Sequence, residues 1–192
     1  MNKKKRGIGV LLLVVATLIS TVIAFKIGIN PPITNIFGAF GAIIFLIVVA
    51  RILKIDDGLF YLGLLFIFIA SPMGSIINLY RTFDPYDKIV HFISGCLLAA
   101  FGMFIIEFLL KKFSNVTDLS SFFIPMIFAA FMFSSACAGI WEIFEFTADN
   151  LAGGGMQRGM VDTVTDMIAG NIGAIIYISV VAIKEKLKNS NK

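Results

Sequence analysis

The sequence predicts an all-α fold, a bundle of six transmembrane helices, and two observations lead to this prediction. First, 58% of the 192 residues are hydrophobic and only 15% are charged, whereas soluble domains average about 45–50% and about 25%. The mean hydropathy is +0.94. Second, the chain contains six apolar stretches of roughly 20 residues, the length that a helix needs to cross a bilayer. Soluble globular, disordered, coiled-coil and disulfide-scaffold classes are therefore excluded.

We expect one transmembrane domain over residues 1–192. Its six helices are expected at residues 7–27, 33–53, 58–77, 88–110, 122–146 and 161–183. The first span follows a basic segment and is longer than the apolar core of a secretory signal, about 7–15 residues, so we expect an uncleaved helix. Each later span follows residues that interrupt helices: Pro31-Pro32, Asp56-Asp57-Gly58, Asp84-Pro85, Ser120-Ser121 and the glycine run at 153–155.

The basic residues predict the direction of the helices. With six spans, 12 of the 16 Lys and Arg residues share a side with both termini, and four lie on the opposite side: Lys26, Arg81, Lys88 and Arg158. Cytoplasmic loops carry the excess of Lys and Arg, so an N-in/C-in, multi-pass protein of the bacterial cytoplasmic membrane is expected. Contacts with anionic headgroups explain the basic charge. Membrane lipids are therefore the expected partners, and nucleic acid is not; the oligomeric state stays open.

Ionisable residues gather at the predicted outer ends of the last three spans. Asp87 and His91 are four residues apart and share a helix face. Glu142 and Glu145 are three apart at the end of the fifth span. Ionisable groups inside a membrane are costly and mark functional sites, so these residues predict a polar site.

The sixth span adds a second pair of acids to this end. Asp162 and Asp166 are four residues apart, Arg158 lies four residues before Asp162, and Asn171 lies five residues past Asp166. The candidate catalytic residues are Asp87, His91, Glu142, Glu145, Asp162 and Asp166. The candidate substrate-binding residues are Arg81, Arg158 and Asn171.

The two glutamates require cationic side chains, a shared proton or a metal ion. They lie at a helix C-terminus, where the dipole opposes negative charge, and they repel each other. Oxygen ligands with a single imidazole fit Mg²⁺, Mn²⁺ or Ca²⁺ better than a structural zinc site. The expected cofactor is a divalent cation, with Mg²⁺, Mn²⁺ and Zn²⁺ as the candidates. The candidate metal ligands are Glu142, Glu145, Asp166 and His91. The alternative is structural, an ion-pair network that joins the three helices.

Two further patterns predict packing. Glu107 and Lys111 are four residues apart at the inner edge of the fourth span, where they are expected to form an ion pair. Gly170 and Gly173 predict a close approach of the sixth helix to a neighbour.

Three motifs resemble a known family over roughly residues 84–175. They are Asp87-Lys88-Ile89-Val90-His91, Trp141-Glu142-Ile143-Phe144-Glu145 and Asp162-x3-Asp166-x4-Asn171-x-Gly173. Together they resemble the DUF2238 (YjdF-like) family of bacterial inner-membrane proteins, and the pattern is similar to VanZ-like proteins, which have Gln where this chain has Glu145. The resemblance implies a membrane protein of unassigned activity with one common site, formed by Asp87, His91, Glu142, Glu145, Asp162, Asp166 and Asn171.

Several functions stay open at this point, and whether the protein is an enzyme stays open with them. The first is the binding or processing of an envelope lipid or lipid-linked headgroup at the outer polar site. The second is proton- or ion-coupled transport, which needs a polar relay across the whole bilayer. The third is a non-catalytic role in membrane assembly or stress resistance. Toward the inner side of the membrane the polar residues stop below Asn171, apart from Ser94, Ser134 and Ser135, so transport is the weaker hypothesis.

Single cysteines, in a background without Cys96 and Cys137, test the orientation. We expect Asn78→Cys to react with an impermeant thiol reagent from outside the cell, because the charge rule places this connector outside. Ser190→Cys should react only after permeabilisation. The reverse labelling pattern would contradict the orientation and place the polar residues on the inner side.

Overall fold

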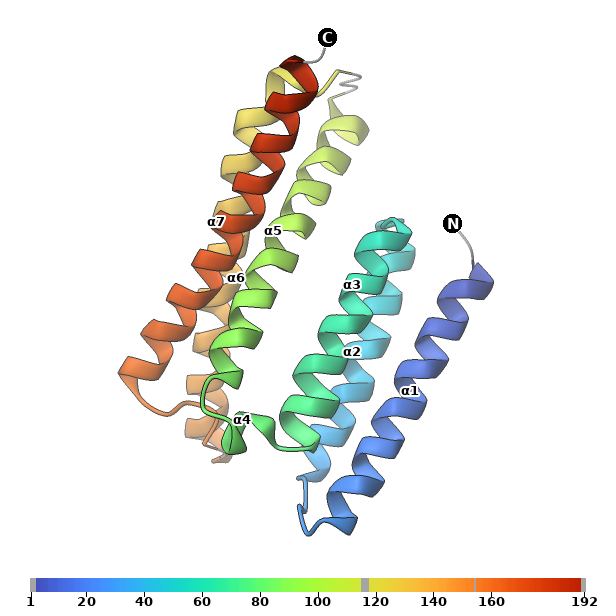
Figure 1. Cartoon of the computed structure of the whole chain (residues 1–192), viewed down its shortest axis with the longest axis vertical. Coiled ribbons are helices and arrows are strands. Elements are labelled where there is room, and N and C mark those ends of the chain that lie inside the picture. The colour runs from blue at the N-terminus through green and yellow to red at the C-terminus, as the bar shows by residue number, and fades with distance from the viewer. Residues whose placement is uncertain (1–2, 115–117, 154, 191–192) are drawn as a thin grey trace. The chain divides into compact units, whose positions relative to one another are not determined.

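The computed structural model describes residues 3–114, 118–153 and 155–190, and all regular structure in these ranges is helical (Figure 1). Gly154, in the glycine run noted above, lies outside them. The helices are α1 (Lys3–Lys26), α2 (Ile33–Ile52), α3 (Asp57–Phe68), η1 (Ile69–Ile76), α4 (Leu79–Thr82), α5 (Tyr86–Phe113), η2 (Ser120–Phe122), α6 (Phe123–Ala152) and α7 (Met160–Ser190). Within these ranges six helical segments are long and apolar enough to cross a membrane, with α3 counted together with η1 and η2 together with α6. The all-α prediction and the six predicted spans are confirmed.

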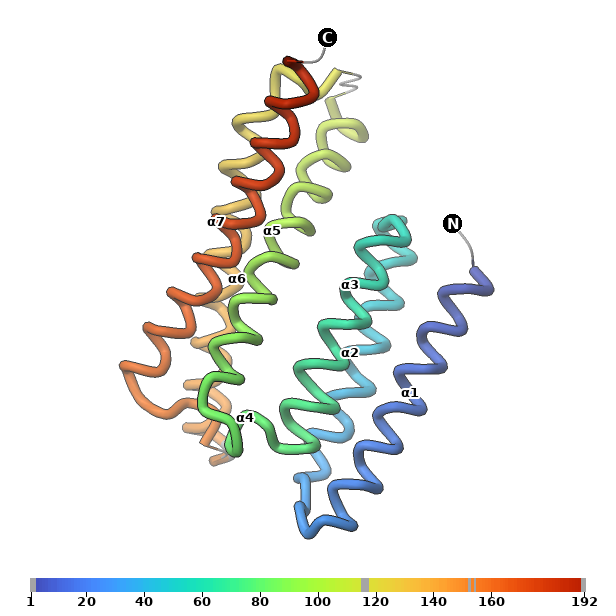
Figure 2. The backbone as a smooth tube through the Cα atoms, in the orientation of Figure 1, coloured from blue at the N-terminus to red at the C-terminus, as the bar shows by residue number. Residues whose placement is uncertain are grey.

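The chain divides into two compact units, Met1–Val90 and His91–Lys192, with the boundary inside the uninterrupted helix α5. In the first unit, α1 and α2 both pack against α3 and η1. The second unit holds most of α5 together with α6 and α7. Figure 2 traces the backbone through both sets of helices.

A buried arginine joins two helices of the first unit. The Arg6 guanidinium is 2.5 Å from a carboxylate oxygen of Asp57 and donates to the Ile55 carbonyl at 2.7 Å. It also lies over the Phe60 ring, 4.7 Å from the centroid. Because Arg6 is only 8% exposed, this basic residue ties the start of α1 to the start of α3.

The third predicted span ends differently from the sequence-based expectation. Its last eight residues, Ile69–Ile76, form the π-helical segment η1, which contains Pro72. Proline lacks a backbone N–H and disrupts the regular α-helical ladder. The Tyr86 hydroxyl donates to the Ile69 carbonyl at 2.8 Å, and the Asn35 side chain donates to the Ser75 carbonyl at 3.2 Å. Side chains distant in sequence therefore satisfy carbonyls of this altered turn.

The buried faces of α5, α6 and α7 are built from small residues. In α5 they are Gly95, Ala99 and Gly102, in α6 Ala130, Ser134 and Ala138, and in α7 Gly170, Gly173 and Ala174. A Cβ atom on Gly95 would overlap the Gly170 carbonyl, and one on Gly173 would overlap the Phe92 carbonyl. The backbones of α5 and α7 are therefore in direct contact, which confirms the predicted close approach of the last helix.

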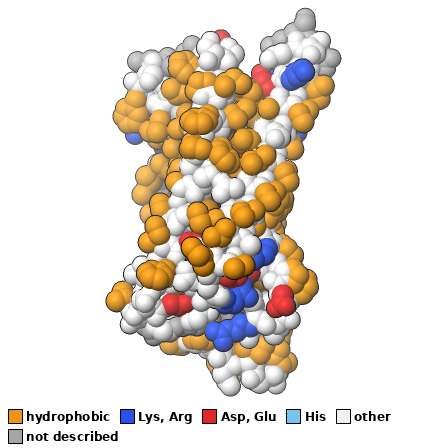
Figure 3. Space-filling view, turned by 90° about the vertical axis from the view of Figure 1, so that its left-hand side faces the viewer, with side chains coloured by type: hydrophobic (Ala, Val, Ile, Leu, Met, Phe, Trp, Pro, Cys, Tyr) orange, Lys and Arg blue, Asp and Glu red, His pale blue; other side chains and the backbone are white. Residues whose placement is uncertain are grey.

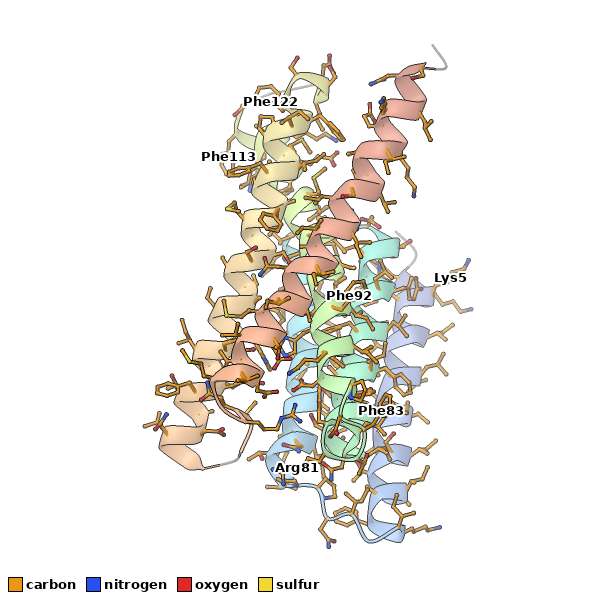
Figure 4. All side chains as sticks on the ribbon, turned by 60° about the vertical axis from the view of Figure 1, so that its left-hand side comes forward. Lys5, Arg81, Phe83, Phe92, Phe113 and Phe122 are labelled. Atoms are coloured by element: carbon orange, nitrogen blue, oxygen red, sulfur yellow. The ribbon has the colours of Figure 1, made fainter. Side chains whose placement is uncertain are left out.

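The C-terminal end of α5 carries the predicted ion pair. Lys111 Nζ lies 2.5 Å from Glu107 Oε1 on the exposed surface, so this prediction is also confirmed. Phe113 and Phe122 lie near each other where α5 ends and α6 is about to begin (Figure 4). These groups lie at the end of the second unit that is remote from His91.

Large hydrophobic side chains are exposed along the spans, as lipid contact requires. Leu11, Phe45, Ile124 and Ile143 are each more than 60% exposed. In the face shown in Figure 3, hydrophobic side chains cover the middle, and charged side chains gather toward its lower end. Exposed apolar surface of this extent is typical of contact with a membrane.

The glycine contacts generate a prediction about stability. Gly173→Ala should destabilise the protein by about 1–3 kcal/mol, because the added methyl group overlaps the α5 backbone. Gly139→Ala on α6 is the matched control, since its nearest neighbour would be the Met167 methyl carbon at 3.8 Å. It should be neutral or slightly stabilising, because alanine is the better helix former. Thermal unfolding in detergent measures both, and equal melting temperatures would contradict the direct contact between the α5 and α7 backbones.

Candidate functional site

Three ionisable side chains from three helices meet in the second unit. His91 Nε2 lies 3.9 Å from Glu142 Oε1 and 4.0 Å from Asp166 Oδ1. Their side chains are 9%, 5% and 1% exposed. We call these residues, His91, Glu142 and Asp166, the triad. Burial of an imidazole and two carboxylates among apolar helices is costly, so their convergence defines the candidate site.

Helix periodicity brings the triad together. His91 lies four residues before Gly95, Glu142 four after Ala138, and Asp166 four before Gly170. Each ionisable residue therefore continues the small-residue stripe of its own helix. His91 is about 8 Å from the start of α5 and Asp166 about 9 Å from the start of α7, at 1.5 Å per residue. The triad is thus shallow with respect to these two helix ends.

Asp87 lies one helical turn before His91 on the same uninterrupted helix. One oxygen of Asp87, one ring nitrogen of His91 and one oxygen of Asp166 lie within 4.8 Å of one another. Asp87 is partly exposed, whereas the other two are buried. These three residues have the geometry of a candidate metal-ligand set.

A second polar layer lies deeper, on the side of the triad away from the α7 N-terminus. Ser135 donates from α6 to the Asn171 side-chain carbonyl on α7. The Asn171 amide in turn donates to the Met167 carbonyl at 2.8 Å. Ser134 donates to the Gly95 carbonyl at 3.1 Å. Asn171, a predicted substrate-binding residue, therefore joins α6 to α7 just below the triad.

The two predicted glutamates are in different surroundings. Glu142 is in the triad, whereas Glu145 accepts a hydrogen bond from the Trp141 indole at 2.9 Å on the exposed side of α6. Residues three apart are separated by about 60° around a helix of 3.6 residues per turn, so they share a broad face but only one of them points directly at His91. The described ligand group of Asp87, His91 and Asp166 includes neither Glu142 nor Glu145.

The other predicted site residues lie at the margin or on another element. Arg158 Nε is 3.3 Å from Asp162 Oδ2, an exposed ion pair in the approach to α7. Arg81 lies on α4, in the first unit (Figure 4). Asp149 is a residue that our site prediction omitted: its carboxylate accepts from the backbone N–H groups of Met156 and Gln157, at 3.0 and 2.8 Å. Its position four residues after Glu145 was the available signal.

The triad has donor chemistry suited to a divalent cation. Carboxylate oxygen and imidazole nitrogen bind Mn²⁺ and Zn²⁺, and carboxylate oxygen also binds Mg²⁺. Separations of 3.9 and 4.0 Å exceed a hydrogen bond. Two ligand atoms that each lie about 2.0–2.3 Å from one ion are up to about 4.6 Å apart. One ligand atom each of Asp87, His91 and Asp166 lies within 4.8 Å of the other two, close to this limit, and Glu142 is not part of that group.

The helices and the triad define a multi-pass membrane protein with a buried histidine–carboxylate site. The family model described as "Predicted membrane protein (DUF2238)" matches residues 8–186, and the chain belongs to this family. The predicted DUF2238 resemblance is confirmed; the similarity to VanZ-like proteins stays a prediction.

One curated relative is an uncharacterized protein of Thermotoga maritima. It is 32% identical over 120 residues, which are 60% of this chain and 57% of the relative. No solved structure matches the chain. The comparisons therefore assign the family, and the description of the relative names no activity.

Mutational coupling tests whether the triad acts as one site. We expect Glu142→Gln and Asp166→Asn to be non-additive in unfolding free energy by about 0.5–3 kcal/mol, because both carboxylates face the same imidazole. Thermal or denaturant unfolding of the two single variants and the double variant measures this coupling. Glu142→Gln combined with Glu107→Gln is the control pair and should be additive. Additive behaviour in both pairs would show that the triad carboxylates do not interact.

Proposed function

We propose that this membrane protein binds a divalent cation at the triad and uses it to hold the phosphate of a lipid or lipid-linked headgroup. One observation carries the proposal: His91 lies 3.9 and 4.0 Å from the Glu142 and Asp166 carboxylates, with all three side chains buried. Of the site residues predicted from the sequence, the proposal assigns functional roles to these three and to Asp87.

The charge of the triad supports a cation. Two ionised carboxylates in an apolar environment repel each other and lose hydration. A divalent cation would balance the negative charge of the two carboxylates and replace the lost solvation. Asp87 adds a further oxygen within reach of His91 and Asp166. The mixed nitrogen and oxygen set favours Mn²⁺ or Zn²⁺ over Mg²⁺.

The position of the triad supports a lipid headgroup as ligand. It lies about 8–9 Å along α5 and α7 from their N-termini, near the boundary between apolar span and connector. Helix N-termini attract anions, and Arg158 lies just before α7. A phosphate held at this level would meet the cation from the headgroup side, while its acyl chains stay in the bilayer.

Asp87, His91 and Asp166 have the ligand geometry, so we propose that they hold the cation and that the Glu142 carboxylate, 3.9 Å from His91, balances its charge. Asp87 is less buried than His91 and Asp166, and in this proposal it faces the incoming headgroup. Headgroup binding is the core of this proposal, and hydrolysis of the bound phosphate ester is the reaction that this arrangement could support.

Cation binding is tested by thermal unfolding of the purified protein after treatment with EDTA. At a concentration of about 100 Kd, Mn²⁺ or Zn²⁺ should raise the melting temperature by about 5–10 °C, because binding to the folded state stabilises it by about 2.7 kcal/mol. Glu142→Gln and Asp166→Asn should lose most of this shift. Glu107→Gln, at the far end of α5, is the matched control and should retain it.

A short-chain phosphatidylglycerol extends the same experiment to the headgroup. The lipid should bind the wild type only when Mn²⁺ or Zn²⁺ is present, and the Asp166→Asn variant not at all. Absence of a shift with Mg²⁺, Mn²⁺ and Zn²⁺ alike would contradict the cation site. A cation shift without cation-dependent lipid binding would contradict the headgroup role.

A further inference from the structure

The exposed side of α6 carries an aromatic and acidic surface separate from the triad. Trp141 and Phe144 are 47% and 52% exposed, and their ring centroids are 5.2 Å apart. The Trp141 indole N–H donates to Glu145 Oε1 at 2.9 Å. We call Trp141, Phe144 and Glu145 the α6 surface. It places a carboxylate at the edge of an exposed indole ring.

The α6 surface lies at the membrane boundary. The apolar run of α6 ends at Phe146, and Thr147, Asp149 and Asn150 follow in the same helix. Exposed tryptophan is typical of the level of lipid headgroups. The carboxylate of Glu145 is therefore positioned where headgroups pass, and not in the middle of the hydrocarbon.

The chemistry of the α6 surface favours a positive group. A carboxylate attracts cations, and the faces of Trp and Phe rings attract ammonium groups within about 6 Å. Because the indole N–H holds the Glu145 carboxylate beside the ring, one ammonium group can approach the carboxylate and the π face together. The phosphate or glycerol of an anionic headgroup gains neither of these interactions.

We propose that the α6 surface binds the ammonium group of phosphatidylethanolamine in the surrounding leaflet. This inference goes beyond the cation site: it concerns another face of α6, a monovalent organic cation and different side chains. It gives Glu145 a role in lipid recognition in place of the metal-ligand role expected from the sequence. The ligand enters from the bilayer and needs no opening of the helix bundle.

Trp141 is the only tryptophan of the chain, so its fluorescence reports this surface directly. The protein is reconstituted in vesicles of equal parts phosphatidylethanolamine and phosphatidylglycerol, with brominated acyl chains on one lipid at a time. Bromine quenches tryptophan on contact, and the composition of the headgroups is identical in both samples. EDTA is present throughout, so a failure of the proposed divalent-cation site does not affect the result.

We expect brominated phosphatidylethanolamine to quench Trp141 at least about twofold more than brominated phosphatidylglycerol, because the ammonium gains a cation–π contact and an ion pair. Glu145→Gln and Phe144→Leu should reduce this ratio toward one. Glu107→Gln is the matched control and should keep the full ratio, because it removes an exposed acid from the other end of the second unit.

Three results would overturn the proposal. Equal quenching by both lipids in the wild type would show that the surface does not select the ammonium group. Soluble phosphoethanolamine is added to the protein in detergent as a probe of the free compound. If phosphoethanolamine changes the Trp141 fluorescence in a saturable way while both lipids quench equally in vesicles, the surface binds the free headgroup and not the lipid.

The third result is a preference for phosphatidylethanolamine that survives in Glu145→Gln. The preference would then come from the bilayer and not from the carboxylate.

Discussion

The direct backbone contact between α5 and α7 is the constraint on which the candidate site depends. Gly95 meets the Gly170 carbonyl, and Gly173 meets the Phe92 carbonyl. Association of helices in a membrane relies on such close packing, because lipid is as apolar as the helix surface. His91 and Asp166 lie one turn from these contacts, at the ends of the same stripes. Larger side chains there would separate the helices and with them the imidazole and the carboxylate.

The protein places its buried charges in two different ways. In the first unit, Arg6 is already matched by Asp57, the Ile55 carbonyl and the Phe60 ring, so its role is to join helices. In the triad, an imidazole faces two carboxylates at distances longer than hydrogen bonds. A negative cluster with space between its ligand atoms suits a cation. This contrast is why we place the function at the triad and not at Arg6.

The two proposals concern different faces of α6. The buried face, which contains Ser134, Ala138 and Glu142, contributes to the triad. The exposed face presents Trp141 and Phe144 to lipid and holds Glu145 by the indole N–H. Both proposals involve a lipid headgroup at the boundary of the bilayer. The phosphate is the ligand proposed for the cation site, and the ammonium group is the ligand proposed for the α6 surface. Membership of the DUF2238 family is compatible with both, because the family description names a membrane protein and no activity.

The sequence alone determined the class, the six spans and the small-residue stripe of the last helix, because hydropathy and helical spacing are local properties. It also identified His91, Glu142 and Asp166 among its candidates. It did not reveal η1, where Pro72 alters the helix and the distant Tyr86 hydroxyl satisfies the Ile69 carbonyl. Nor did it separate Glu142 from Glu145, since residues three apart share a broad face. Only the tertiary structure decided that Glu142 faces His91 while Glu145 bonds to Trp141, because the rotation of α6 is set by its packing against α7 and not by its own sequence period.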